Sequence, residues 1–304
     1  MSCWESLSPS TQTIMVFSNI SFHIDKIYEK ICIVDIDTKY IEETKLKTKK
    51  RLLDILKHGD IISCQSKSQC RGLKFKKNNI KTEKRMSYFR NEVSIEIYIN
   101  NIILNLMVFN HCIKIAGCKY HHHSLEVIEI FWEKYLMNDN TFWNLENTSD
   151  KTVNFIFYPV MINYDFNLGF DINREKLNIL MNDEKYSLKV FMSQYETTGH
   201  TNVNIKMVSE PMQSEYDCIE YSKGQNGLYD LLYLTKTKDI SYYKKKKNKK
   251  DYITFIVFST SEVILSGKDN NTMKDAYCFF IDTIQQNKDM IKETIVKKNT
   301  FDFR

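Results

Sequence analysis

An internal repeat is the feature that most constrains the fold of this chain. The segment 19–27 reads like the segment 167–174, because an Asn, a Phe and an Ile recur at the same spacing 148 residues later. Farther along, the segment 106–119 resembles the segment 255–268, and their glycines lie 150 residues apart. A fixed displacement of this kind is the sequence signature of a repeated supersecondary unit. We therefore expect two similar halves, each built from the same order of strands and helices.

Each half is predicted to contain a strand, a helix, further strands and a final helix. The last part of each half reads as an apolar strand, a polar tip and a second strand, followed by a helical pattern. Ser124 and Thr272 precede the first apolar residues of those helical patterns and are candidate N-caps. The alternating strands 93–97 and 203–207 correspond to each other, and the Asn pair at 100–101 predicts a tight hairpin because Asn tolerates positive φ.

The repeat also sets the expected domain boundaries. We expect a first repeat over residues 10–137 and a second over 152–296, with a polar linker between them. The first repeat carries an insertion at about 35–85, and the second carries one at about 208–251 that contains a run of lysines. Each insertion lengthens one connection of the repeated unit without changing its order.

The composition is that of an ordinary globular protein. Of its 304 residues 42% are hydrophobic, and only 8 are Gly and 3 Pro, which argues against collagenous, disordered and small disulfide-stapled classes. The apolar stretches are too short or too polar to span a bilayer, no leader opens the chain, and the cysteines are scattered. A soluble intracellular protein with reduced thiols is therefore expected. The net charge of +5, mostly from Lys rather than Arg, gives only weak support to nucleic-acid binding.

The sequence shows no recognisable catalytic motif. It has no P-loop, dinucleotide fingerprint, metalloprotease motif or supported catalytic triad, so we expect no enzyme activity and no cofactor. Cys112, Cys118 and the histidines at 121–123 offer zinc ligands, but the spacing between the cysteines is wider than in a zinc knuckle. Cys112 also falls in a predicted strand, where a thiol packs as a small hydrophobe. We therefore assign no metal site.

The order of elements, together with one hairpin motif, resembles the TATA-box-binding protein (TBP) family. The motif runs from Phe258 to Lys268 and matches without a gap the family's pattern of a Phe, a small pair, a turn, an apolar run and a Thr-Gly pair. The segments 89–93, 163–166 and 203–206 look like the divergent versions encoded by large cytoplasmic DNA viruses. The resemblance covers most of residues 10–290.

This resemblance implies an α+β fold and a function. The fold is a pseudo-twofold saddle, in which a curved antiparallel sheet of about ten strands carries helices on its convex side and lays its concave face in the minor groove. Apolar wedges then unstack base steps and bend A/T-rich promoter DNA. The implied partners are a factor-IIB-like protein and RNA polymerase. The implied protein is a monomer in the host cytoplasm or virion, with the host nucleus as the alternative.

Aromatic wedges are the DNA contacts that the resemblance assigns most directly. Phe258 is the expected wedge of the second half. Phe109 is the expected wedge of the first half if one residue is deleted at the hairpin tip, whereas a gapless count places Val108 there. Phe89 and, in the second half, His200 are the expected partner wedges. A phenylalanine in an alternating strand is also a common core residue, so the exposure of these rings on the sheet decides between the two interpretations.

Other contacts follow from the same resemblance. Several groove positions depart from the family's Asn, Thr and Val, which relaxes the expected preference for TATA sequences. Lysines are expected at phosphates, and the resemblance implies that the insertion at about 208–251 extends the stirrup hairpin that straddles the duplex. Strand lysines and lysine runs are also common on solvated surfaces. The expected groove residues are Thr13, Met15, Ala116, Met161, Asn163, Ile256, Ile264 and Ser266, and the expected phosphate contacts are Arg90, Lys114, Lys206, Lys245 and Lys247.

The sequence leaves more than one function open. The first hypothesis is a viral-type transcription initiation factor that binds and bends A/T-rich promoter DNA. The second is a TBP-fold module that binds proteins of the transcription machinery, with weak or no sequence-specific DNA binding. A nucleic-acid-binding platform attached to an enzyme is a third hypothesis, which is weakened because no catalytic domain accompanies the repeats.

Overall fold

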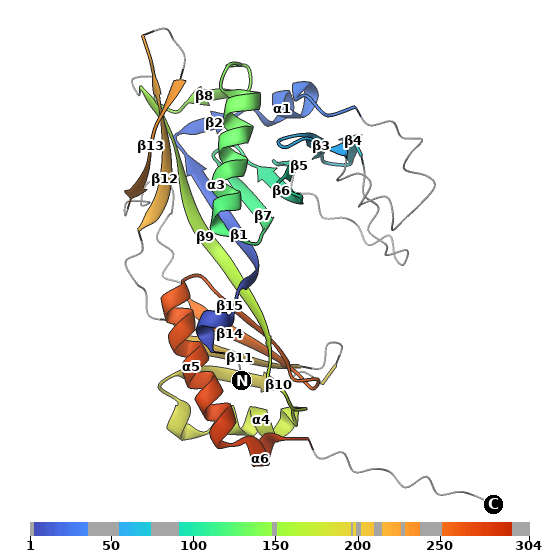
Figure 1. The fold of residues 1–304 in the computed structure, drawn as a ribbon, viewed down its shortest axis with the longest axis vertical. Coiled ribbons are helices and arrows are strands. Elements are labelled where there is room, and N and C mark those ends of the chain that lie inside the picture. The colour runs from blue at the N-terminus through green and yellow to red at the C-terminus, as the bar shows by residue number, and fades with distance from the viewer. Residues whose placement is uncertain are drawn as a thin grey trace, which may run out of the picture. The chain divides into compact units, whose positions relative to one another are not determined.

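The chain forms two compact units, drawn in Figure 1 from a computed structural model. The structure describes residues 3–35, 55–73, 91–147, 151–195, 197–198, 202–209, 215–225, 229–237 and 251–293. Unit 1 comprises Met1–Ser10, Met161–Met212 and Lys247–Arg304, and unit 2 comprises Thr11–Val160 and Gln213–Lys246. Each unit is therefore assembled from segments that are far apart in the sequence.

Unit 2 is an antiparallel sheet that packs helices against one face. Its elements are β1 (Pro9–Ser18), β2 (Ile20–Phe22), α1 (Ile24–Lys30), β3 (Ile61–Ser66), β4 (Gln69–Gly72), β5 (Val93–Ile99), β6 (Ile102–Val108), β7 (Cys112–Cys118), α3 (His121–Ile130), the π-helix η3 (Phe131–Leu136), β8 (Trp143–Leu145), the first part of β9 (Thr152–Asn167), β12 (Tyr216–Lys223) and β13 (Tyr229–Thr237). The strand order is β9-β1-β7-β6-β5-β3-β4, while β2 pairs with β8 in a small separate sheet.

Unit 1 is a smaller antiparallel sheet that also packs helices against one face. Its elements are the 3-10 helix η1 (Trp4–Ser6), the last part of β9, α4 (Arg174–Met181), η4 (Glu184–Tyr186), β10 (Val190–Tyr195), β11 (Asn202–Val208), β14 (Tyr252–Phe258), β15 (Glu262–Gly267), α5 (Asn270–Gln286) and α6 (Lys288–Ile291). The strand order is β10-β11-β14-β15-β9.

Both units have the same strand order and the same placement of helices. The order β1-β7-β6-β5-β3 in unit 2 corresponds to β9-β15-β14-β11-β10 in unit 1. In each unit one helix comes early in the repeat, α1 after β2 and α4 after β9, and another follows the last strand of a hairpin, α3 after β7 and α5 after β15. The predicted α+β fold with an internal repeat is therefore confirmed. The antiparallel sheet has 13 strands among the described residues, more than the predicted ten or so, because β4, β12 and β13 have no counterpart in the other half. β3 lies within the expected first insertion, although it corresponds to β10, so this part of the range belongs to the repeat.

Alternating side chains give the strands β1, β6, β7, β11, β14 and β15 a buried and an open side. In β1, Ile14 and Val16 are buried, whereas Thr13 and Met15 between them are partly exposed. The buried side chains pack with those of the helices, and each such burial stabilises the fold by roughly 1.5–3 kcal/mol. The period-2 pattern that predicted the strands is thus also the pattern that separates the core from the open side.

Helices α3 and α5 begin one turn earlier than their predicted N-caps. Asp269 is the N-cap of α5, because its Oδ1 accepts a hydrogen bond from the backbone N–H of Thr272 at 2.9 Å. Ser124 lies inside α3, and its Oγ donates to the carbonyl of His121 at 2.6 Å. Ser124 and Thr272 are therefore wrong as N-caps, since a polar residue in the first turn of a helix resembles a cap in sequence.

The tight hairpin predicted between β5 and β6 is confirmed. Asn100 and Asn101 have φ of 43° and 69°, and they connect the paired residues Ile99 and Ile102. Positive φ at both turn residues matches the twist of the flanking strands, and Asn adopts it more readily than most side chains.

The segment expected to be a polar linker contributes to the core of unit 2. Phe142 and Trp143 are buried, and the Trp143 Nε1–H donates to the carbonyl of Leu136 at 2.9 Å. The polar residues around this aromatic pair masked its role in the sequence. Residues 137–147 are therefore part of unit 2 rather than a free connection.

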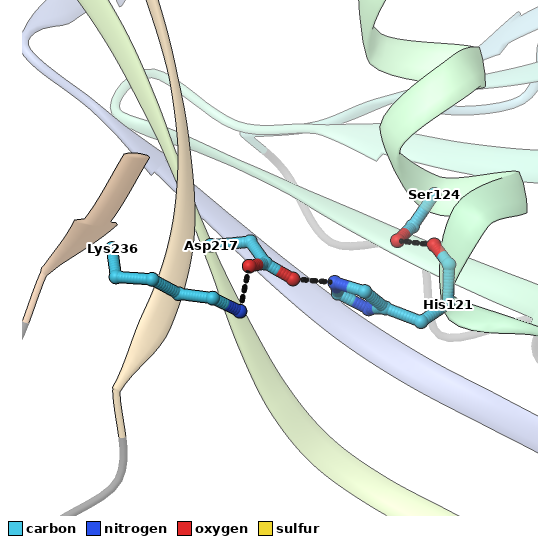
Figure 2. Close-up of polar contacts among 4 residues, drawn as sticks. All are labelled: His121, Ser124, Asp217 and Lys236. Atoms are coloured by element: carbon cyan, nitrogen blue, oxygen red, sulfur yellow. Dashed lines mark hydrogen bonds and ion pairs between the residues drawn. The ribbon is translucent and has the colours of Figure 1, made fainter. Parts of the chain in front are cut away.

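The insertion of the second repeat folds as the hairpin β12-β13 and belongs to unit 2. Residues 218–222 of β12 pair with residues 152–156 of β9, and Ile219 and Tyr221 are buried in the core of that unit. Figure 2 shows how polar contacts add to this attachment. The Asp217 carboxylate lies between His121 Nε2, at 2.6 Å, and the ammonium group of Lys236. Sheet pairing, apolar packing and the contact between Asp217 and His121 of α3 hold the hairpin to the rest of unit 2, while Lys236 joins Asp217 within the hairpin.

Candidate nucleic-acid interface

The open face of unit 1 is the side of its sheet opposite the helices. Paired residues of neighbouring antiparallel strands point to the same side, so they form rows across the sheet. Polar and apolar side chains are mixed in these rows, and they are exposed or only partly buried. One row is Lys206, Thr254, Ser266 and Asn163, and the next is Asn204, Ile256, Ile264 and Asp165.

The open face of unit 2 has the same construction. Its side chains are partly exposed and alternate along each strand with the buried residues of the core. The row that corresponds to the first row of unit 1 is Glu96, Asn105, Ala116 and Thr13, and the next is Ser94, Met107, Lys114 and Met15.

Strand pairing makes Phe109 the equivalent of Phe258. Val108 of β6 is paired with Val93 of β5, as Val257 of β14 is paired with Val203 of β11. A phenylalanine directly follows the valine of β6 and the valine of β14. Both rings are partly exposed, whereas Val108 is fully buried. The gapless count that placed Val108 at the wedge position therefore differs from the structural register.

The difference in register comes from the hairpin tips. In unit 2 the pair Val108 and Ile113 closes the β6-β7 tip, and in unit 1 the pair Val257 and Val263 closes the β14-β15 tip. The tip of unit 2 is thus one residue shorter. A single deletion inside a turn leaves the strand pairing unchanged, which is why counting along the sequence cannot locate it.

Within each unit, the central row pairs two of the expected groove residues. Thr13 is paired with Ala116, and Asn163 is paired with Ser266 at the equivalent position of unit 1. The repeat displacement of 148 residues instead makes Met161 the counterpart of Thr13. Met161 lies two residues earlier on β9, where 40% of its surface is exposed.

Charges of both signs lie on the open faces. Lys114 and Lys206 are there as expected, but Glu96, Asp165 and Glu262 occupy neighbouring positions in the rows. The Oγ of Ser63 donates to Glu96 at 2.8 Å, which orients that carboxylate on the sheet. The described part of the interface therefore has no excess of positive charge. Sequence reasoning missed these carboxylates because it followed only the positions that matched the family pattern.

Three buried polar atoms on the open faces have no hydrogen-bond partner among the described residues. They are the Oδ1 atoms of Asn163 and Asn204 and the Oε2 atom of Glu92. Burial raises the pKa of Glu92, and nearby Lys114 partly opposes this. Two further unpaired atoms, Ser18 Oγ and Trp132 Nε1, belong to buried residues, so unpaired polar atoms are not confined to the open faces.

An aromatic cluster on unit 2 was not among the expected contacts. Phe17 and Tyr158 have ring centroids 6.2 Å apart, and Tyr158 and Tyr216 have centroids 5.3 Å apart. Met15 packs against the same cluster. The alternation of Met15 and Phe17 in β1 was the available signal, but the contribution of Tyr216 depends on the long-range pairing of β12 with β9 and is not visible in the sequence.

Several expected contacts lie outside the described residues. They are Phe89, Arg90, His200, Lys245 and Lys247. The register does show where the lysine-bearing insertion leaves unit 1, because Val208 of β11 is paired with Tyr252 of β14. Phe258 lies at the other end of this strand pair. The insertion is therefore not an extension of the hairpin tip next to Phe258.

Neither a metal-binding cluster nor a helix able to cross a bilayer occurs among the described residues. The candidate zinc ligands have other roles. Cys118 is buried, which raises the pKa of its thiol to about 12, and burial also raises the pKa of Cys112. Metal binding needs a thiolate, so a raised pKa opposes it. His121 is engaged with Asp217 (Figure 2).

Comparisons with known proteins find a structural likeness without a sequence family. No protein-family model matches the chain, and no curated protein matches it at a significant level. Among solved structures, the chain is similar to Methanococcus jannaschii TBP, with a TM-score of 0.39 and 10% sequence identity. The match covers 92% of this chain and 98% of that chain. A likeness at this level does not show what this chain binds.

Proposed function

We propose that this chain is a DNA-binding transcription factor that binds A/T-rich promoter DNA in the minor groove and bends it. The observation that carries the proposal is the placement of Phe109 and Phe258. They occupy equivalent positions in two equivalent repeats, and both rings are partly exposed on open faces. Repeated rings on repeated sheets suit a ligand that itself repeats, and a duplex presents equivalent base steps along its length.

The chemistry of the open faces suits insertion between base steps. Unstacking a step costs a few kcal/mol, and burial of a phenylalanine ring returns roughly 1.5–3 kcal/mol. Ile256 and Ile264 add apolar surface beside Phe258. The amide groups of Asn163 and Asn204 are available to donate to the acceptors that A·T pairs present in the minor groove.

The sequence resemblance supports the finer parts of the proposal. We assign the chain to the viral type of such factors, acting inside the host cell with a factor-IIB-like protein and RNA polymerase. Helices α3 and α5 lie on the sides opposite the open faces, which gives each unit separate surfaces for DNA and for protein partners. The proposal requires no catalytic residue and no cofactor.

A bending assay tests the proposal. A short A/T-rich duplex carrying a donor and an acceptor dye at its ends is titrated with the wild-type protein, with Phe109→Ala/Phe258→Ala, and with the control Phe279→Ala on α5. We expect the wild type and the control to bind and kink the duplex, and the double variant to lose the kink. A folded wild-type protein that does not bind below about 1 µM at modest salt refutes the proposal, because nonspecific binding alone reaches that range.

The carboxylates favour a second function, in which the open faces bind a protein. Glu96, Asp165 and Glu262 repel phosphates but suit a partner with basic side chains. The same assay separates the two functions. An interaction module leaves the duplex straight, and Glu96→Gln/Asp165→Asn then weakens capture of the transcription partner. In a DNA-binding factor this double variant instead strengthens DNA binding.

A further inference from the structure

A polar hollow of about 470 Å³ lies beside the hairpin tip that carries Phe109. It is formed by parts of unit 2 that are distant in sequence: the segment from the end of β2 to the start of α1, the β3-β4 turn, Asn91 before β5, and the β6-β7 tip. The hydrogen bond from Phe22 N–H to the carbonyl of Asn110, at 2.7 Å, holds this tip against β2. The polar side chains that line the hollow are His23, Asp25, Lys26, Lys67, Asn91 and Asn110.

The lining favours an anion. Lys26 and Lys67 supply ammonium groups, Asn91 and Asn110 supply amide donors, and Asp25 is the only carboxylate among the lining side chains. Lys26 Nζ lies 3.8 Å from the Glu29 carboxylate, and both side chains are more than half exposed, so this ion pair competes weakly with a ligand. Lys67 makes no ion pair with any described residue.

The backbone at Lys67 provides a second indication. Lys67 has a φ of 55° and lies in the two-residue turn between the paired residues Ser66 and Gln69. This left-handed conformation favours Gly over any side chain with a Cβ atom. Lysine has no advantage over Gly in this conformation, and its side chain adds an ammonium group to the lining of the hollow.

We propose that this hollow binds a phosphate of the DNA backbone next to the base step that Phe109 enters. The inference rests on the proposed function and names a contact beyond it, since none of the lining residues belongs to the expected interface. A phosphodiester needs several N–H donors and positive charge, which the hollow provides. Asn110, which lines the hollow, directly follows Phe109 in the sequence.

Salt-dependent binding of the A/T-rich duplex tests the site. Removal of one phosphate contact reduces the slope of log K against log salt by roughly 0.9. For Lys26→Gln/Lys67→Gln we expect a slope lower by about that amount and weaker binding at low salt, with the kink retained. Lys176→Gln, an exposed lysine of α4, is the matched control and leaves the slope unchanged.

The variant Lys67→Gly separates binding from folding. We expect it to keep or raise the midpoint of thermal unfolding, because Gly relieves the turn, and to weaken DNA binding as Lys67→Gln does. If wild type binds and bends the duplex but the lysine variants have the wild-type slope and affinity, the phosphate site is refuted and the proposed function stands. If wild type does not bind the duplex, both are refuted.

Discussion

Replacing Asp217 by Asn perturbs the contact that attaches the β12-β13 hairpin to unit 2. The Asp217 side chain is only 13% exposed, and it accepts from His121 Nε2 at 2.6 Å while also pairing with Lys236. A hydrogen bond to a charged group contributes about 1.5–3 kcal/mol. The Lys236 side chain is 58% exposed, so its share is roughly 0–1 kcal/mol. Because Asn keeps the shape and one acceptor, we expect Asp217→Asn to weaken the attachment by about 2 kcal/mol.

Hydrogen exchange measures this loss at the hairpin itself. A change of about 2 kcal/mol in local opening accelerates exchange about 30-fold. We expect this acceleration at the amides of Ile219 and Tyr221, and no change at Ile97 in β5. Asp275→Asn, at an exposed position of α5, is the matched control and leaves all of these rates unchanged. Unaltered exchange in β12 of Asp217→Asn refutes the reasoning, because sheet pairing and packing alone then hold the hairpin.

Three further predictions concern pH, packing and thiol chemistry. Burial alone raises the pKa of Asp217, but hydrogen bonds from Lys236 and His121 outweigh it and hold this pKa below its ordinary value. The stabilisation that the Asp217 carboxylate provides is therefore fully present above its unfolded-state pKa of about 4, and it is lost as pH falls through the folded-state pKa. The difference in unfolding free energy between wild type and Asp217→Asn should therefore shrink in acid. Gly267→Ala places a Cβ atom 2.5 Å from Met273 Cγ. We expect this substitution to lower the unfolding free energy by about 1–3 kcal/mol in a denaturant titration. An unchanged unfolding midpoint contradicts the packing of α5 on β15. In native protein, a thiol reagent should modify the exposed cysteines first, and these are Cys3, Cys32 and Cys278. Rapid modification of the buried cysteines Cys64, Cys118 and Cys218 contradicts the structure.

The repeat was predictable because it depends on local alternation and spacing. Strands with period-2 burial and the Asn100-Asn101 turn are encoded by neighbouring residues, and each half repeats them independently. The equivalence of Phe109 and Phe258 was only partly predictable. A deletion inside a turn has no local signal, and cross-strand pairing alone fixes its position.

Long-range pairing explains most of what the sequence did not predict. The attachment of β12 to β9 joins residues about 65 positions apart, and no local pattern selects that partner over another strand. The carboxylates Glu96 and Asp165 were visible in the sequence, but their location on open faces depends on which side of each strand meets the helices. The polar hollow at Lys67 combines four separate segments, so it exists only in the folded chain.

The interleaving of the two units has a consequence for how this protein is made and divided. Residues at the start of the chain complete unit 1, where Trp4 lies 4.8 Å from Tyr164 between ring centroids. Unit 2 in turn needs a hairpin that a ribosome synthesises only after β10 and β11 of unit 1. A truncated protein that ends between the two repeats would therefore leave Trp132 without its neighbours Tyr221 and Tyr229. Neither repeat is a self-sufficient module, and both reach their final packing only after most of the polypeptide has been synthesised.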